Sequence, residues 1–353
     1  MLRMLASCKC TLRPLMQNLI KIFRKIFTRF LYELMEQKGR QHMSNLYLPE
    51  GRLLHTDENQ RAAATLPALR RALEQETVLE GRAVLCTPQH DLLVNLGPFT
   101  GRIPREEAAL GIREGTTREI AILSRVGKPI AVTVTGLDQG ADAPLLLSRR
   151  RAQELALEAL LACPPGTVLP ATVTHLEGFG AFVDLGCGVV SMIGIENCSV
   201  SRLSHAGERF TLGQEIFVVL TGADRAQGRL FLSHKELLGT WLENAARFAP
   251  GMTVAGWVRG LKPYGTFVEL APNLTGLADQ TEGLEENDRV SVYIKAILPD
   301  RMKVKLSLIH RLDPQPAPDP LVYFITSGRL SRWEYSPPGR ARGKIETIFG
   351  PGD

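Results

Sequence analysis

Residues 166–190 read GTVLPATVTHLEGFGAFVDLGCGVV, and residues 251–270 repeat the pattern as GMTVAGWVRGLKPYGTFVEL. The FGAF of residues 179–182 aligns with the YGTF of residues 264–267, 85 positions later. Self-similarity at a fixed offset is the signature of a repeat architecture, so this pair of stretches decides the fold. Each copy also places two aromatic residues three positions apart, in a chain that is only 6% aromatic.

The unit that begins at residue 166 contains five short segments with the composition of strands. Residues 167–176 alternate β-branched and polar residues, as a half-buried strand does. After turn signals at glycine, further strands are predicted over 179–185, 189–195, 215–221 and 229–233. Five strands in one short unit are typical of a small Greek-key barrel of the OB type, whose closure removes exposed sheet edges.

These residues resemble the RNA-binding repeat of the ribosomal protein S1 family. That family has a glycine-led first strand, then F/Y-G-A-F-V-D-L-G, S-R-x-x-H-P, and R-I-x-L-S-x-K at the end. Residues 166–235 match nearly every element, including SRLSH and RLFLSHK. Residues 251–309 match at both ends, with YGTFVEL and KVKLSLIH, around a shorter middle. A fainter copy lies upstream, VLEGRAVLCTPQHDLLVNLG at 78–97, in which HDLL replaces the aromatic pair.

The joints between the repeats have a helical pattern. Residues 148–163 and 233–249 each follow the last strand of a repeat and each end at proline, which is a helix stop signal. We therefore expect a mainly β fold of tandem five-stranded OB-fold (S1-type) barrels joined by short helices. The expected segments are a basic amphipathic extension (1–43), an N-terminal lead-in (44–75), a degenerate repeat (76–150), two S1-type repeats (164–236 and 249–312), and a proline-rich linker with a C-terminal β tail (313–353).

Charge is distributed unevenly along the chain. The formal net charge is +5, but residues 1–43 carry nine Lys or Arg and two Glu, which is +7 and leaves −2 for the remainder. Bulk attraction to a polyanion therefore does not support RNA binding by the repeats. Binding there would depend on stacking aromatic residues with a few cations nearby.

The sequence contains no motif for catalysis or metal binding. P-loop, G-x-S-x-G and H-E-x-x-H patterns are absent. The six cysteines are scattered without C-x-x-C spacing, which disfavours zinc and is typical of free thiols in a reducing cytoplasm. We expect a protein that is not an enzyme, with no cofactor, no metal and no small-molecule substrate.

The aromatic strand has a chemistry suited to single-stranded nucleic acid, because an exposed ring stacks on any base, at about 1–3 kcal/mol per base. A regular strand sends positions i and i+3 to opposite faces. Gly180 and Gly265 allow a local bend that brings both rings onto one face. The alternative is that one or both rings belong to the core. The resemblance places both on the RNA face.

The resemblance implies further RNA contacts, each with a structural alternative. Arg229 and Lys303 match the basic residue of the family's last strand, which implies contact with phosphate. The alternative is that they are solvated charges on a strand. Arg202 and His205 match S-R-x-x-H in the loop before strand four, where a histidine is more often structural. Trp257 stands where the family often has a lysine on the first strand. It either extends the stacking surface of the aromatic pair or packs against the joint helix that carries Trp241. The family's third-strand histidine is absent, with Gly194 and Asp279 in its places. The expected RNA-binding residues are Phe179, Phe182, Arg202, His205, Arg229, Trp257, Tyr264, Phe267 and Lys303.

The resemblance implies single-stranded RNA (mRNA) binding in translation, in the cytoplasm, with the small ribosomal subunit as a partner. Two alternatives stay open: a protein-interaction scaffold whose repeats have lost RNA binding, and an RNA-binding regulator outside the ribosome. Residues 15–35 have one apolar helical face flanked by cations, a pattern that suits an anionic membrane surface. A start at Met43, with the segment before it outside the mature protein, is favoured over that membrane contact. For the C-terminal tail, with Tyr323, Trp333 and Tyr335, the hypothesis is packing on the third barrel.

Overall fold

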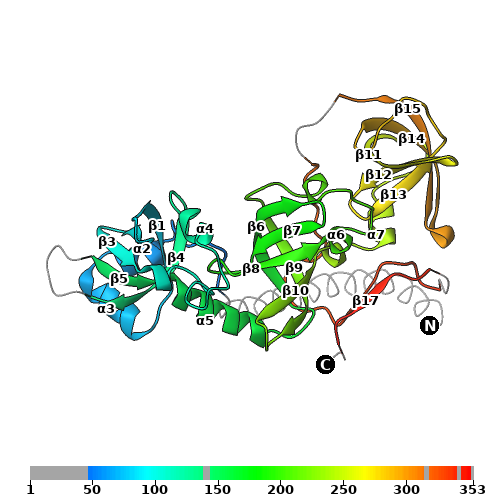
Figure 1. Cartoon of the computed structure of the whole chain (residues 1–353). Coiled ribbons are helices and arrows are strands. Elements are labelled where there is room, and N and C mark those ends of the chain that lie inside the picture. The colour runs from blue at the N-terminus through cyan, green and yellow to red at the C-terminus, as the bar shows by residue number, and fades with distance from the viewer. Residues whose placement is uncertain (1–46, 138–143, 314–317, 340–342, 351–353) are drawn as a thin grey trace, which may run out of the picture. The chain divides into compact units, whose positions relative to one another are not determined.

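The computed structural model describes residues 47–137, 144–313, 318–339 and 343–350. The expectations for residues 1–43, including the start at Met43 and the membrane contact of residues 15–35, lie outside the described residues. Three closed five-stranded barrels make up most of the described chain and confirm the expected tandem OB-type fold (Figure 1). In the described part of the chain, no helix is long and apolar enough to span a membrane.

The first barrel follows two helices, α2 (Asp57–Ala63) and α3 (Leu66–Glu74). Thr65 caps α3, because its hydroxyl accepts a hydrogen bond from the Ala68 amide. The strands lie in the order β1-β2-β3-β5-β4, and η1 (Arg105–Glu107) and α4 (Ile120–Leu123) fill the long connection after β3. The strands of this barrel are β1 (Leu79–Cys86), β2 (Leu92–Leu96), β3 (Phe99–Ile103), β4 (Pro129–Gly136) and β5 (Leu145–Ser148).

The second barrel begins after α5 (Arg149–Ala162), the helix expected at the first joint. The loop before β9 contains α6 (Ile195–Cys198) and η2 (Ala206–Glu208). Along β7 the side chains of Ala181 and Val183 are fully buried and Phe182 is only half-buried, so the strand presents alternate residues to the core. The strands of this barrel are β6 (Val168–Glu177), β7 (Gly180–Asp184), β8 (Val190–Gly194), β9 (Glu215–Asp224) and β10 (Arg229–Ser233).

The second joint is not one helix but two short ones, η3 (Lys235–Leu238) and α7 (Trp241–Ala245). Gly239 interrupts the helical path with a φ of +81°, and the Thr240 hydroxyl then caps α7 by accepting from the Glu243 amide. The third barrel follows, with η4 (Pro299–Arg301) between its last two strands. Its strands are β11 (Thr253–Lys262), β12 (Gly265–Ala271), β13 (Leu274–Ala278), β14 (Arg289–Leu298) and β15 (Lys303–Arg311).

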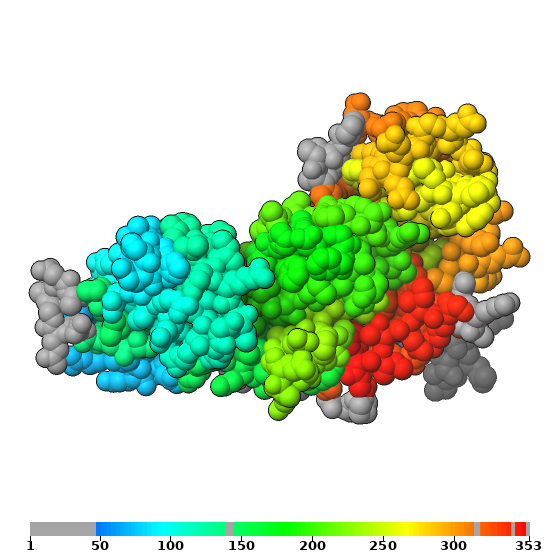
Figure 2. Space-filling view, viewed as in Figure 1, coloured from blue at the N-terminus to red at the C-terminus, as the bar shows by residue number. Residues whose placement is uncertain are grey.

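The C-terminal tail forms a small hairpin of β16 (Arg332–Glu334) and β17 (Glu346–Ile348). Its expected contact with the third barrel exists, because the Tyr335 hydroxyl donates to the Asn273 carbonyl. The tail also packs on the second barrel: the Leu330 amide donates to the Gly166 carbonyl, and the Tyr323 hydroxyl lies 2.9 Å from His234 Nε2. Figure 2 shows this segment in red against the green surface of the second barrel.

Candidate nucleic-acid interface

Both aromatic pairs lie on the outside of their barrels. Phe179 is 57% exposed and Tyr264 is 69% exposed, and each meets its partner ring, Phe182 or Phe267, edge to face at 6.1 Å between centroids. A side chain at Gly180 is excluded, since its Cβ would lie 2.2 Å from the Ile193 carbonyl oxygen. Glycine at this position therefore permits the close approach of β7 and β8 beside the two rings.

In the second barrel, the aromatic pair belongs to a longer row of outward side chains that crosses four strands. The register pairs His175 of β6 with Phe182 of β7, Phe182 with Met192 of β8, and Met192 with Phe231 of β10. The His175 and Phe182 rings are 6.1 Å apart, and Phe231 is 53% exposed. Sequence reasoning missed three members of this row. The sequence did indicate that each of these residues points outward, because each has an outward position in an alternating strand. Only the register between strands shows that they form one row.

The same row in the third barrel has a different composition. Gly260 pairs with Phe267, Phe267 with Leu277, and Leu277 with Lys305. Lys303, a predicted site residue, precedes Lys305 on β15 and is exposed with it on the same side of the strand. A neighbouring lysine, Lys295, is neutralised by Asp279 at 2.8 Å between Nζ and Oδ2.

The other predicted residues of the second barrel lie in two places. Arg229 is exposed at the start of β10, two positions before Phe231 and on the same face. Arg202 and His205 lie in the loop between α6 and β9, outside the row of side chains. His205 caps η2, because its Nδ1 accepts from the Gly207 amide at 2.9 Å. That hydrogen bond gives His205 a structural use, whereas Arg202 lines a surface hollow of about 400 Å³ with Lys235 and Ile345.

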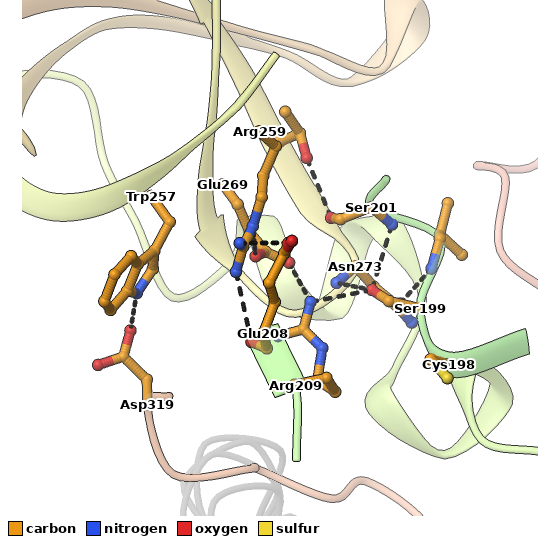
Figure 3. Close-up of polar contacts among 12 residues, drawn as sticks. Cys198, Ser199, Ser201, Glu208, Arg209, Trp257, Arg259, Glu269, Asn273 and Asp319 are labelled. Carbon is orange, nitrogen blue, oxygen red and sulfur yellow. Dashed lines mark hydrogen bonds and ion pairs between the residues drawn. The ribbon is translucent and has the colours of Figure 1, made fainter. Parts of the chain in front are cut away.

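Trp257 is half-buried on the outward face of β11, where it pairs in register with Glu269. Its indole Nε1 donates to Asp319 at 2.8 Å, and the Arg259 guanidinium lies 5.9 Å from the ring (Figure 3). A segment after the third barrel thus holds the Trp257 indole through Asp319. Trp257 lies apart from the Phe267 row, at a contact between barrels.

That contact is a buried ion-pair network between the second and third barrels (Figure 3). Glu269 accepts from Arg209 and, at 2.7 Å, from Arg259. Arg259 also pairs with Glu208 at 2.7 Å. Burial alone would raise the pKa of Glu269, but the two guanidinium groups outweigh it and hold this pKa below its usual value. Asn273 adds a second polar contact, accepting from the Val200 amide at 2.8 Å.

The first barrel has ion pairs where the other two have aromatic rings. His90, at the position of Phe179, contacts Glu119 at 3.1 Å, and Glu119 also binds Arg105. Asp91 pairs with Arg102 on β3. The guanidinium of Arg105 keeps the pKa of Glu119 below its ordinary value, so this face carries fixed charges. Among the described residues, no group of three or more His, Cys, Asp and Glu side chains is arranged to hold a metal.

Comparison with known proteins matches the second barrel to a family model and a longer part of the chain to curated relatives. The S1 RNA binding domain family matches residues 163–235. Small ribosomal subunit protein bS1 of Leuconostoc lactis is 31% identical over 261 residues, 68% of this chain and 59% of that protein. The bS1 homolog of Bacillus subtilis (strain 168) is 30% identical over 210 residues, 55% of this chain and 54% of that protein. The bS1 protein of Mycobacterium tuberculosis is 28% identical over 262 residues, 72% of this chain and 52% of that protein.

These comparisons confirm the resemblance found in the sequence. The chain spans somewhat more than half the length of each of these curated relatives.

Proposed function

We propose that this chain, a tandem S1-repeat protein related to the ribosomal protein S1 family, binds single-stranded RNA in translation. The second and third barrels are the binding modules, mRNA is the ligand and the small ribosomal subunit is the partner. The protein acts in the cytoplasm and is not an enzyme. The first barrel serves as a spacer or protein-docking module.

One observation carries this proposal: two barrels of the same chain each present an exposed edge-to-face aromatic pair at the same register position. An exposed apolar ring on a strand has no packing function in its own barrel, and a nucleobase covers it at a gain of about 1–3 kcal/mol. The surrounding side chains suit the ligand, since Arg229 and Lys303 add exposed cations on the same faces. Phe179, Phe182, Tyr264 and Phe267 are therefore the principal contacts, and Arg202, His205 and Trp257 are secondary ones.

The Phe179→Ala, Phe182→Ala double variant tests the binding site. Loss of two stacking contacts costs on the order of 2 kcal/mol or more, which is roughly a 30-fold weaker affinity for unstructured RNA. Leu66→Ala is the control, because Leu66 is 55% exposed on α3, outside both aromatic faces. A folded double variant that binds RNA as tightly as the control would remove the site assignment.

A scaffold without RNA binding is the competing function, and the ion-paired face of the first barrel favours it for that module. The two functions separate in one experiment. Native protein is sedimented with small ribosomal subunits, with and without nuclease treatment. Release by nuclease supports attachment through RNA, and retention after nuclease supports attachment through protein.

A further inference from the structure

The faces of the second and third barrels carry different charges at equivalent positions. Phe231 and Lys305 each lie two positions after the basic residue of the last strand in their barrel. Phe231 pairs with Met192 of β8, and Lys305 pairs with Leu277 of β13. In each barrel, that partner strand is the neighbour of the aromatic strand. Glu177 and Lys262 are also equivalent, because each pairs with the glycine that opens the aromatic strand. At two separate positions, therefore, the third barrel has a cation where the second has a phenyl ring or a carboxylate.

We infer that the two barrels divide the RNA between them: the second binds bases by stacking, and the third binds the phosphate backbone through Lys262, Lys303 and Lys305. This inference rests on the proposed function and assigns the chemistry of each face.

In the second barrel, the charges on this face cancel. Arg229 pairs across the strands with Asp224, and the carboxylate of Glu177 lies 2.7 Å from His175 Nε2, next to the Phe182 ring. The remaining members of the row are apolar or aromatic: Phe179, Phe182, Met192 and Phe231. Such a surface stacks on bases and releases few counterions when it binds, so salt has little effect on it.

In the third barrel, the charges on this face add. Lys262, Lys303 and Lys305 are all exposed, and none forms an ion pair within the described chain. Asp279, which follows the last residue of β13, already pairs with Lys295. Three lysine ammonium groups around the Tyr264 and Phe267 rings suit a strand whose phosphates pass the rings, and each phosphate contact makes the affinity dependent on salt.

Exchanging the equivalent residues tests this division in the full-length chain. The variants are Phe231→Lys and Lys305→Phe, with Leu66→Lys as a control that adds the same charge on α3. Affinity for an oligouridylate of about 20 nucleotides, long enough for two OB folds, is measured at several salt concentrations. Residues 1–43 are present in every protein, so their contribution cancels in the differences between slopes.

The expected result is a pair of opposite shifts. The slope of log affinity against log salt changes by about 0.7 for each phosphate contact to single strands. Lys305→Phe should make the slope shallower by about that amount, and Phe231→Lys should make it steeper, while Leu66→Lys leaves it unchanged. At high salt, Phe231→Lys should also bind more weakly than the parent, because a stacking surface is lost.

Other outcomes separate the two ideas. If the parent binds the oligonucleotide but Lys305→Phe leaves the slope unchanged, the division of labour is wrong and RNA binding stands. The division is equally wrong if Leu66→Lys steepens the slope as much as Phe231→Lys, because position on the face then has no importance. If the parent itself does not bind, the proposed function fails. Circular dichroism melts verify that each variant is folded.

Discussion

Arg259 of the third barrel and Glu208 of the second form an ion pair of 2.7 Å between Nη1 and Oε2, and the two side chains are 5% and 10% exposed. With Glu269 and Arg209, they place two carboxylates and two guanidinium groups in one buried contact. Charges removed from water are costly unless every one is paired. The network therefore stabilises one arrangement of the two barrels and is sensitive to the loss of any member.

The first prediction concerns Glu269, which is shared by both arginines. Glu269→Gln leaves the buried guanidinium groups with one carboxylate, so the free energy of unfolding should fall by about 3 kcal/mol or more. Asp279→Asn is the control, because the Asp279–Lys295 pair is exposed and its loss should cost less than about 1 kcal/mol. Urea unfolding of both variants makes the comparison. Equal, small losses would show that the network contributes no stability.

The second prediction concerns the tail. The Tyr335 hydroxyl donates to the Asn273 carbonyl in a buried contact, and the ring is 5% exposed. Tyr335→Phe removes the donor and should lower the free energy of unfolding by about 1–3 kcal/mol. Tyr293→Phe serves as the matched control, since Tyr293 is 39% exposed. A loss no larger than that of Tyr293→Phe would mean that this hydrogen bond does not hold the tail.

The third prediction compares fragments. Residues 47–163 carry His90 and Leu93 in place of an aromatic pair and should bind unstructured RNA far more weakly than residues 164–350, in which two linked modules act on one strand. The longer fragment must include the tail, because Trp333, Tyr335 and Phe349 belong to the same core cluster as residues of the third barrel. Equal affinity of the two fragments in a binding titration would overturn this order.

The fourth prediction concerns the overall dependence on salt. Among the described residues of the two faces, Arg229 and the three lysines of the third barrel are exposed cations without an ion pair, so few counterions are released on binding. The effective neutralised charge should be roughly two to four, against the 6–10 phosphate contacts of strongly salt-dependent binders. The measurement uses protein that starts at Met43, because the preceding residues carry +7. A steep slope would mean that phosphate contacts, rather than the aromatic rings, dominate the affinity.

The sequence was sufficient to predict the barrels and the aromatic pairs, because both depend on local patterns. Alternation predicts strands, and a glycine between two aromatic residues marks each aromatic pair. It was not sufficient for His175, Met192 and Phe231. These residues become neighbours only through the register of four strands, and a β-bulge between Val173 and His175 alters the register of the β6–β7 pair. A bulge leaves no dependable mark in one sequence.

The contacts between the barrels could not be predicted from the sequence either. Glu208 and Arg259 are 51 positions apart, and each reads as an ordinary surface charge. Their burial follows from a contact between two folded units, which no local pattern encodes. The contact of the tail with the second barrel was missed for the same reason: the Tyr323 hydroxyl reaches His234, which lies 89 positions earlier in the sequence.

The last prediction concerns Glu80 on β1, which joins the lead-in segment to the first barrel. Its two carboxylate oxygens each accept a backbone hydrogen bond at 3.0 Å, from Gly51 and from Leu53. Burial outweighs these bonds and raises the pKa of Glu80 to about 7, and the negative charge of Glu50 adds to the rise.

Below its raised pKa, Glu80 is protonated in the folded chain, whereas in the unfolded chain it ionises near pH 4.5. Unfolding between these values releases a proton, so a rise in pH favours the unfolded state. The stability of the parent relative to Glu80→Gln should therefore fall from about pH 5 to pH 7, by up to about 1.4 kcal/mol per pH unit, and level off above about pH 8. His234, whose burial lowers its pKa to about 3, titrates equally in both proteins and cancels. Denaturant midpoints of both proteins across this range measure the difference, and a constant difference would show that Glu80 keeps an ordinary pKa in the folded protein.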